Sequence, residues 1–316
     1  MNKRKWNYDY EVPEGKKVRY IIHTDCKNEA DDQFTVAHAL MTEKLDVKGI
    51  IAGHFDKANY GRFEEHKTAN ASFDEIKKIL ELMGLVDDYS VYMGSNIALE
   101  NEEEPILTEG VQFIIDEAMR DDERSLYIGM QGAITDLASA ILTEPRICDR
   151  MTCIWIGGGD YPAGGNEFNL WQDVIAARIV FNSSMPIWQI TRSLYKQFAT
   201  SLAELQLKVK PCGEIGKYLY EQMLMVNNEL FPRGPWPHGE AWALGDEGCV
   251  CALLEEIERD DGYTMIEAPY IKDDMTYEFG IGNRSIRVYH KMDVRLDLED
   301  LFAKLFINFA SKRIEP

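Results

Sequence analysis

The sequence predicts one α/β domain with a mostly parallel central sheet flanked by helices. Strand-like and helical patterns alternate along much of the 316-residue chain, which is typical of βαβ units. Two strand candidates, at 126–130 and 152–156, are nearly continuous apolar runs, as expected of parallel strands covered on both faces. No Gly-, Ser- or Pro-rich linker divides the sequence, so we expect a single domain over residues 18–316. A polar N-terminal extension at 1–17 precedes it.

The alternation runs through residues 18–190. The β-branched and aromatic run at 18–22 predicts the first strand, and apolar residues at helical spacing after it, such as Phe34, Ala37 and Leu40, predict the first helix. The further strands of this part are expected at 47–52, 89–93, 126–130, 152–156 and 186–190. Its helices are expected at 31–41, 64–84, 110–120, 135–142 and 173–182. Beyond residue 200 we expect helices at 211–229 and 246–257, short strands at 263–268, 276–280 and 285–290, and a last helix at 298–310.

Composition and charge narrow the class of protein. The chain has 54 acidic and 34 basic residues, and its formal net charge of -20 repels nucleic acid and anionic membranes as main partners. No stretch approaches the ~20 apolar residues that cross a bilayer, and the first residues lack the apolar run of a signal peptide. The six cysteines include no Cys-x-x-Cys pair and are interpreted as reduced, mostly buried thiols. We therefore expect a soluble, cytoplasmic protein.

The most informative segment lies between the first strand and the first helix. Four acidic residues, Asp25, Glu29, Asp31 and Asp32, fall within eight positions. Like charges repel, and hard cations such as Ca²⁺ or Mg²⁺ take oxygen ligands of this kind. Ligands of open α/β sheets also bind at the carboxyl ends of the strands. The alternative is one helix N-cap, at Asp31 or Asp32, with solvated loop acids around it.

This segment resembles the N-terminal signature of the nucleoside hydrolases, the calcium-dependent N-ribohydrolases. The longer form of that signature is Asp-Thr-Asp-x-x-x-Asp-x-Asp-Asp, and residues 23–32 read HTDCKNEADD, with His23 in place of the first Asp. Further matches follow in family order: VKGII at 47–51, VYMG at 91–94, GAITDLA at 132–138, GGG at 157–159, NEFN at 166–169 and LGDE at 244–247. They span roughly residues 18–310. The resemblance implies a nucleoside hydrolase-like fold with a Rossmann-like core.

The resemblance also implies a reaction. It is the hydrolysis of the N-glycosidic bond of a ribonucleoside or related N-riboside, giving ribose and free base. Asp25 matches the residue that binds Ca²⁺ and acts as general base, because a metal-bound water loses its proton more easily to a nearby carboxylate. Asp32 matches a bidentate calcium ligand, and the backbone carbonyl of Thr135 and the carboxylate of Asp246 match the remaining protein ligands. Waters or the ribose diol would complete the shell of Ca²⁺.

The resemblance places further residues around the ribose. Asp31 matches the residue that hydrogen-bonds the 2′-hydroxyl, and Glu167 and Asn169 match residues that hold ribose hydroxyls. If their segment is extended, Glu167 and Asn169 point the same way and Phe168 faces the core; the alternative is a polar surface loop. Asp56 is the nearest spacing match to an Asn that contacts ribose in relatives.

The leaving-group side departs from the family. Gly245 stands where several nucleobase-specific relatives carry a His that protonates the departing base. His238 is near in sequence and is a candidate replacement, the alternative being a solvated loop histidine. Without an acid, the base would depend on stacking against Trp242 or two other candidates, Trp171 and Trp236.

The resemblance further implies a small nucleoside-like substrate and a homodimer or homotetramer. Two other functions stay open: a non-catalytic ribose- or sugar-binding protein, and a metal-dependent hydrolase of another bond, such as a phosphoester, on the same scaffold. A phosphoester would require a basic clamp, and few basic residues, such as Lys27 and Arg192, are candidates for it. Retention of Asp25, Asp32 and Asp246 argues against a protein without catalysis.

Overall fold

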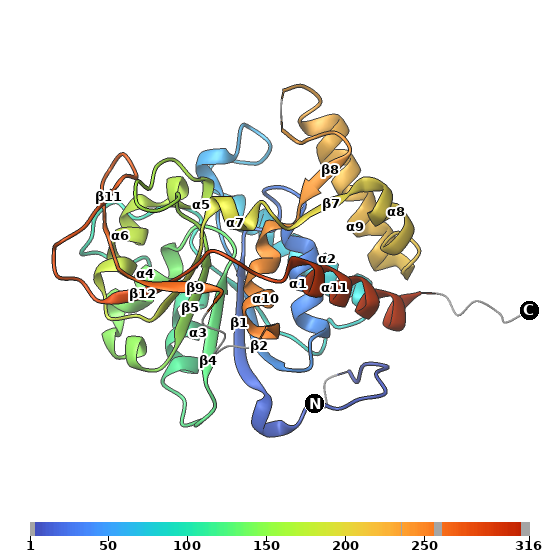
Figure 1. Ribbon diagram of the computed structural model, residues 1–316, viewed down its shortest axis with the longest axis horizontal. Coiled ribbons are helices and arrows are strands. Elements are labelled where there is room, and N and C mark those ends of the chain that lie inside the picture. The colour runs from blue at the N-terminus through green and yellow to red at the C-terminus, as the bar shows by residue number, and fades with distance from the viewer. Residues whose placement is uncertain (1–3, 235, 256–260, 311–316) are drawn as a thin grey trace, which may run out of the picture.

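Eight strands form the central sheet, in the spatial order β3-β2-β1-β4-β5-β6-β12-β9 (Figure 1). The structure, a computed structural model, describes residues 4–234, 236–255 and 261–310. Neighbouring strands are parallel except β9, which pairs antiparallel with β12 at one edge. The strands are β1 (Val18–Thr24), β2 (Leu45–Ala52), β3 (Val91–Met93), β4 (Leu126–Met130), β5 (Thr152–Ile156), β6 (Ile187–Ile190), β9 (Tyr263–Glu267) and β12 (Ser285–Tyr289). The predicted fold class, a mostly parallel sheet flanked by helices, is confirmed.

Helices cover both faces of this sheet, because successive side chains of a strand point to opposite sides. In β1, Tyr20 and Ile22 join an apolar cluster with α1, α2, α9, α10 and α11, whereas Ile21 joins a second cluster with α3, α4 and α6. Figure 1 shows these two groups of helices on opposite sides of the strands. The helices are α1 (Asp32–Met41), α2 (Thr68–Met83), α3 (Glu109–Ala118), α4 (Thr135–Thr143), α5 (Phe168–Gln172), α6 (Val174–Asn182), α7 (Arg192–Tyr195), α8 (Leu202–Lys208), α9 (Gly213–Met225), α10 (Gly248–Leu254) and α11 (Val294–Phe309).

Several boundaries differ from the prediction. The helix expected at 64–84 begins at Thr68, and the one expected at 211–229 divides into α9 and a π-helical turn, Val226–Leu230. The helix expected at 246–257 starts as a 3₁₀ turn, Gly245–Glu247, and α10 ends at Leu254; residues 256 and 257 lie outside the described part. The strand expected at 276–280 is reduced to β11 (Tyr277–Glu278), which pairs with β10 (Tyr270–Ile271).

Short elements were not predicted. They are α5, α7, α8 and the two-stranded sheet of β7 (Ala199–Ser201) and β8 (Ala241–Ala243). Elements of this length carry too few residues to establish a period. The last helix begins at Val294, four residues earlier than expected, because Asp293 caps it: Oδ1 of Asp293 accepts the N–H of Leu296 at 2.9 Å.

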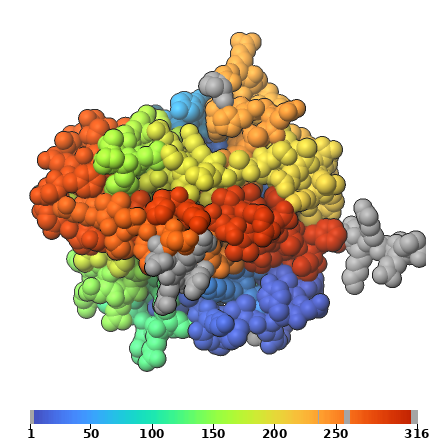
Figure 2. Space-filling model, in the orientation of Figure 1, coloured from blue at the N-terminus to red at the C-terminus, as the bar shows by residue number. Residues whose placement is uncertain are grey.

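The described part of the N-terminal segment packs against the helical face that carries α1 and α11. Trp6 donates its indole N–H to the carbonyl of Leu40 at 3.0 Å, and the Tyr8 hydroxyl donates to the carbonyl of Met41 at 2.9 Å. The N–H of Asn7 donates to the side chain of Asn308 at 2.9 Å. Figure 2 shows this blue segment beside the red α11 on one face of the molecule. Among the described residues, no helix is long and apolar enough to cross a membrane.

Candidate active site

The strand order reverses between β1 and β4, and this reversal opens a crevice. β1 and β4 are neighbours in the sheet, but α1, which follows β1, and α4, which follows β4, lie on opposite faces. The loops that follow the two strands therefore diverge and leave a crevice between them. Ligands of open α/β sheets bind in a crevice of this kind. Residues 25–31 form the loop after β1, and residues 131–134 form the loop after β4.

Three carboxylates meet in this crevice. Asp31, Asp32 and Asp246 each place an oxygen within 4.8 Å of the others, and all three side chains are buried. Asp31 caps α1: its Oδ1 accepts the N–H of Asp32 at 3.1 Å, and its Oδ2 accepts the N–H of Gly245 at 2.9 Å. Thr24 donates its hydroxyl to Oδ1 of Asp32 at 2.5 Å. Asp31 is therefore both a helix cap and a member of an acidic cluster.

Asp25 lies with these three carboxylates in the lining of an inner cavity of about 50 Å³, to which Glu29 and Glu167 also contribute. Its side chain is 1% exposed, and its Oδ2 has no hydrogen-bond partner among the described residues. Gly132, in the loop after β4, approaches so closely that a Cβ there would lie 2.9 Å from Cγ of Asp25. Glycine at position 132 thus makes room for the Asp25 carboxylate.

Burial and mutual repulsion make these groups hard to ionise. Burial, together with the charge of Asp32, raises the pKa of Asp25 well above its ordinary value, and the same two causes raise the pKa of Asp246. Burial raises the pKa of Asp31 to about 6 despite its backbone hydrogen bonds. Burial, reinforced by the charge of Asp31, raises the pKa of Asp32 to about 8. A cation beside the cluster would favour the ionised forms of all four.

Glu167 and Asn169 reach the same inner cavity from the segment after β5. Oε2 of Glu167 accepts the N–H of Gly158 at 2.8 Å and that of Leu170 at 2.9 Å, which makes Glu167 the N-cap of α5. Oε1 of Glu167 accepts the hydroxyl of Tyr195 at 3.0 Å. The backbone bonds fix Glu167 firmly, while its Oε1 stays on the cavity side.

The local structure around Glu167 differs from the expected extended segment. The chain is helical from Phe168 onward, and Phe168 lines the cavity rather than the core. Asn169 faces the cavity from the first turn of α5 and donates Nδ2 to the carbonyl of Ile156 at 2.8 Å. Glu is not among the preferred N-cap residues, so the sequence held no strong signal for this helix start.

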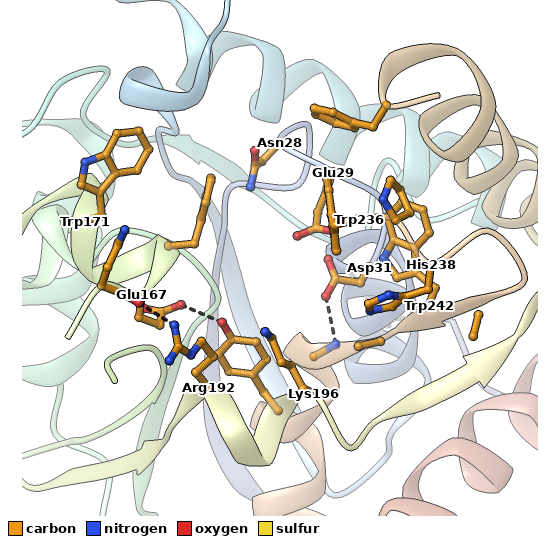
Figure 3. Close-up of a pocket in the computed structure, with 18 of the residues that line it drawn as sticks. Asn28, Glu29, Asp31, Glu167, Trp171, Arg192, Lys196, Trp236, His238 and Trp242 are labelled. Atoms are coloured by element: carbon orange, nitrogen blue, oxygen red, sulfur yellow. Dashed lines mark hydrogen bonds between the residues drawn. The ribbon is translucent and has the colours of Figure 1, made fainter. Parts of the chain in front are cut away.

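The inner cavity continues into an outer cavity of about 820 Å³ with a largely aromatic wall (Figure 3). Asp31, Glu167 and Tyr195 line both cavities. The aromatic lining consists of Tyr60, Phe168, Trp171, Tyr195, Phe231, Trp236 and Trp242. Figure 3 shows Trp171 on one side and Trp236 with Trp242 on the other. This space fits a flat ring system attached to a polar group held in the inner cavity.

Tyr195 occupies the space beside Gly245. A Cβ added at Gly245 would lie 3.0 Å from Cδ2 of the Tyr195 ring. The aromatic ring therefore fills the place toward which a side chain at 245 would project. His238 lies in the wall of the outer cavity and is exposed, and Trp242 is buried there.

Two predicted site residues lie elsewhere. Thr135 begins α4, so its carbonyl is engaged within the helix, and its hydroxyl donates to Oδ2 of Asp173 at 2.7 Å and contacts Nε2 of His54 at 2.8 Å. Asp56 binds His66: its Oδ2 lies 2.7 Å from Nδ1 of that residue, and its Oδ1 accepts the backbone N–H at 3.1 Å. Neither Thr135 nor Asp56 is among the described residues that line the two cavities.

Gln131 is the residue that the sequence analysis missed. It directly follows β4 and lines the inner cavity with the four carboxylates. Its side chain is buried, and neither of its polar side-chain atoms has a hydrogen-bond partner within the described ranges. The signal was available, since residues that follow the carboxyl end of a parallel strand border the crevice.

Comparisons with known proteins identify a family. A family model described as "Inosine-uridine preferring nucleoside hydrolase" matches residues 20–300. An inosine-uridine preferring nucleoside hydrolase of Leishmania major is 35% identical over 107 residues, which are 33% of this chain and 34% of that protein. The pyrimidine-specific ribonucleoside hydrolase RihB of Shigella flexneri is 27% identical over 145 residues, 44% of this chain and 46% of that protein. These alignments thus span between a third and a half of the relatives' lengths.

Solved structures show the same fold over nearly the whole chain. The purine-preferring ribonucleoside hydrolase from Gardnerella vaginalis superimposes with a TM-score of 0.70 and 16% identity, covering 91% of this chain and 98% of its own. A plant nucleoside hydrolase, PpNRh1, gives a TM-score of 0.68 at 19% identity with the same coverage. At such identities the likeness concerns the fold.

Proposed function

Because the chain belongs to the family of inosine-uridine preferring nucleoside hydrolases, we propose that it hydrolyses the N-glycosidic bond of a ribonucleoside or a related N-riboside with the help of Ca²⁺. The products would be ribose and the free base. One observation carries this proposal: Asp25, Asp32 and Asp246 share a small inner cavity with Glu167 and Asn169, and that cavity opens into an aromatic one.

The donor set of the inner cavity fits a hard cation. All four acids are buried, and Oδ2 of Asp25 lacks a partner among the residues described. Asp31 is already held by two backbone N–H groups, so we assign Asp25, Asp32 and Asp246 as the carboxylates that would hold Ca²⁺. We propose the backbone carbonyl of Gln131 in place of that of Thr135, because Gln131 lines the inner cavity and its carbonyl accepts Nδ2 of Asn169 there at 3.4 Å. Bound Ca²⁺ would offset the carboxylate charge and make a neighbouring water more acidic.

Asp25 is the proposed general base. Its unpartnered Oδ2 is available to take a proton from the attacking water, and Gly132 keeps the space around the carboxylate open. The water would then attack the anomeric carbon as the bond to the base breaks, with positive charge on the ribose ring stabilised by nearby carboxylates.

Asp31, Glu167 and Asn169 are the proposed ribose partners. Each is held by backbone hydrogen bonds that leave it little freedom to turn away. Such fixed polar groups reject a sugar that lacks the matching hydroxyl, because they would then remain buried and unpaired. We therefore propose that the ribose, more than the base, decides which substrates are cleaved.

The leaving base is proposed to depend on aromatic stacking. Gly245 offers no side chain, and His238 is exposed in the wall of the outer cavity. The indoles of Trp236 and Trp242 meet edge to face, with ring centroids 5.5 Å apart, and form one wall against which a base could stack.

A substrate panel tests the proposal. Inosine, uridine, 2′-deoxyinosine, p-nitrophenyl riboside and a phosphate ester are incubated with the full chain in Ca²⁺ or in a chelator. Release of base or phenol only in Ca²⁺, with the deoxy compound slower by about 10⁴ to 10⁵ in kcat/KM, is the expected result. Phosphate release would favour the phosphoesterase alternative, and ribose binding without turnover would favour a sugar-binding protein.

The oligomeric state and the location of the chain stay predictions. We propose a homodimer or homotetramer, which light scattering on the eluted protein measures directly. We also propose a cytoplasmic location, consistent with the strongly acidic composition and the reduced cysteines, which cell fractionation tests.

A further inference from the structure

A second buried group of ligand-type side chains lies next to the site. His38 on α1, Glu247 in the 3₁₀ turn before α10, and Asp297 on α11 each offer an atom within 4.8 Å of the others. All three side chains are 0% exposed. Glu247 directly follows Asp246, so two consecutive residues belong to two different buried clusters. The three elements come from distant parts of the sequence and pack together on one face of the sheet (Figure 1).

Hydrogen bonding in this group is incomplete. Both carboxylate oxygens of Asp297, and Oε1 of Glu247, have no hydrogen-bond donor among the described residues, although the two carboxyl groups lie within hydrogen-bond reach of each other. Nδ1 of His38 lies 2.7 Å from Oε2 of Glu247 and 3.9 Å from Oδ1 of Asp297. A buried carboxylate is strongly unfavourable unless it is protonated, paired or bound to a metal. Three acceptor atoms in this buried group therefore lack a donor, and a ligand that contacts several oxygens at once would satisfy them.

The other side of the His38 ring is fixed. Its Nε2 lies 2.9 Å from Oδ2 of Asp300, and Asp300 also contacts Nζ of Lys304. Lys304 donates to the hydroxyl of Thr42 at 2.8 Å, and that hydroxyl donates to the carbonyl of His38 at 2.8 Å. Histidine ligands of metals commonly donate their second ring N–H to a carboxylate in this way. The arrangement aims Nδ1 of His38 at Glu247 and Asp297.

Charge balance distinguishes two possible occupants. With Glu247, Asp297 and Asp300 ionised and Lys304 charged, the group lacks two positive charges. Two protons would supply them, one on His38 and one shared by Glu247 and Asp297, but one shared proton leaves at least one of the three unpartnered oxygens without a donor. A divalent cation supplies both charges and contacts oxygens of both carboxylates.

We propose that His38, Glu247 and Asp297 bind one divalent transition-metal ion of the zinc and manganese class. One imidazole with two carboxylates suits these ions, whereas Ca²⁺ prefers oxygen ligands alone. Donors around tetrahedral Zn²⁺ lie about 3.4 Å apart, so Nδ1 of His38 and Oε2 of Glu247 would separate by about 0.7 Å from their present 2.7 Å. The ion would join α1, α11 and the turn that presents Asp246. This inference does not depend on the proposed hydrolase function.

Metal content tests the proposal without any activity assay. The full chain is stripped with a chelator, supplied with excess Ca²⁺ to fill the acidic crevice, and titrated separately with Zn²⁺ and with Mn²⁺. Metal per chain is then measured by mass spectrometry after gel filtration. The expected result is one equivalent of Zn²⁺ or Mn²⁺ that excess Ca²⁺ does not displace, together with a higher melting temperature.

Variants locate the bound ion. Asp297→Asn removes a proposed ligand with little change in volume, and Asp300→Asn removes the partner of His38, which should weaken affinity about 10- to 100-fold. Asp297→Asn should weaken it further. Asp32→Asn is the matched control in the other cluster: it should weaken Ca²⁺ binding and leave the transition metal in place.

Three results would overturn the proposal. One is a wild-type chain that retains no transition metal in excess Ca²⁺. Another is an Asp297→Asn variant that binds Zn²⁺ as tightly as the wild type. The third is a wild-type melting temperature that neither Zn²⁺ nor Mn²⁺ changes, together with a metal-free Asp297→Asn variant that melts at a higher temperature than the metal-free wild type. A carboxyl pair that shares a proton would predict that third result. Should the variants fail to fold, Co²⁺ absorption of the wild type decides: visible bands of a four- or five-coordinate ion support the site, and the spectrum of aqueous Co²⁺ contradicts it.

Discussion

Removing Ca²⁺ should make the protein less stable, and the loss should grow as the pH rises. In the metal-free protein, burial raises the pKa of Asp31 to about 6, from the ordinary value of 3.8 that applies to the unfolded chain. Between these two values the folded state binds more protons than the unfolded state. The stabilisation from the retained proton is therefore fully present below about pH 4 and is lost as the pH rises through about 6.

The size of the effect follows from the shift. About two pKa units on Asp31 correspond to about 3 kcal/mol at 25 °C. A chain of 316 residues unfolds with an entropy of about 0.7 kcal/mol per kelvin, so the melting temperature should fall by about 4 °C from this residue alone. Asp32, whose pKa is raised to about 8, acts in the same direction and extends the window to about pH 8. Bound Ca²⁺ keeps these carboxylates ionised and removes the dependence.

Scanning fluorimetry of chelated and Ca²⁺-loaded protein between about pH 3.5 and about pH 8.5 measures the effect, because these limits bracket the pKa window by about half a unit on each side. The difference in melting temperature between the two forms should widen with rising pH. Asp31→Asn should reduce the widening, since Asn is an equally good N-cap but takes up no proton. Asp74→Asn, on the exposed side of α2, should leave it unchanged. A difference that is the same at both ends of the range would refute the assignment of these acids to the cation site.

Three further predictions concern catalysis and packing. Asp25→Asn should lower kcat by about 10² to 10⁴ with an unchanged circular dichroism spectrum, and near-normal turnover would show that another group is the base. Tyr195→Phe removes the hydroxyl that donates to Oε1 of Glu167 and should lower kcat/KM for ribosides by about 10- to 100-fold. The same loss with a 2′-deoxyriboside would show that Glu167 acts on the sugar as a whole and not on the 2′-hydroxyl alone. Gly132→Ala should lower the free energy of unfolding by about 1–3 kcal/mol and weaken Ca²⁺ binding, because the added Cβ would press on Asp25. Denaturation and calorimetry measure the two effects, and an unchanged Ca²⁺ affinity would contradict the close packing.

The elements of the central sheet and the helix after its first strand were predictable because their patterns are clear, with continuous apolar runs for buried strands and helical spacing of apolar residues for α1. The apolar runs at 126–130 and 152–156 became β4 and β5 with the same boundaries, and 31–41 became α1 with a difference of one residue. The region after residue 200 was harder. α8 and the sheet of β7 and β8 are short, and their positions depend on contacts with distant segments rather than on local sequence.

The acidic loop could be located from the sequence, whereas the residue of the next loop that borders the crevice could not. Strand and helix signals bracket residues 25–31, so the strand-end rule points to their carboxylates directly. Thr135 was chosen by its place in a motif, but it is the first residue of α4, directly after the crevice-forming loop, with its carbonyl in the helix. The residue that borders the crevice is Gln131, one position after the strand ends. Asp56 was chosen by spacing alone, and spacing does not show that it would bind His66.

Helix ends help to explain how so many acids can share a buried space, and they leave a free-energy cost that a cation would offset. Asp31 caps α1, Asp32 is the first residue of that helix, and Asp246 lies two residues before α10. The partial positive charge of a helix N-terminus stabilises a nearby anion by about 0.3–1 kcal/mol, or about 2 kcal/mol when partly buried. Burying a carboxylate costs several kcal/mol, on the order of twice that gain or more.

The helix ends therefore reduce the cost of the cluster without cancelling it, as the raised pKa values of Asp31 and Asp32 indicate. Asp297 lies near the start of α11, so the same comparison applies to it.

Because Asp246 and Glu247 are consecutive, a movement of their turn that reduces the charge repulsion in one cluster also moves the carboxylate that belongs to the other. If both clusters hold cations, removing the transition metal should change the Ca²⁺ affinity, and by linkage removing Ca²⁺ should change the affinity for the retained transition metal by the same factor. Calorimetric titration of each ion in the presence and absence of the other measures that factor, and a factor of one would show that the two clusters are independent.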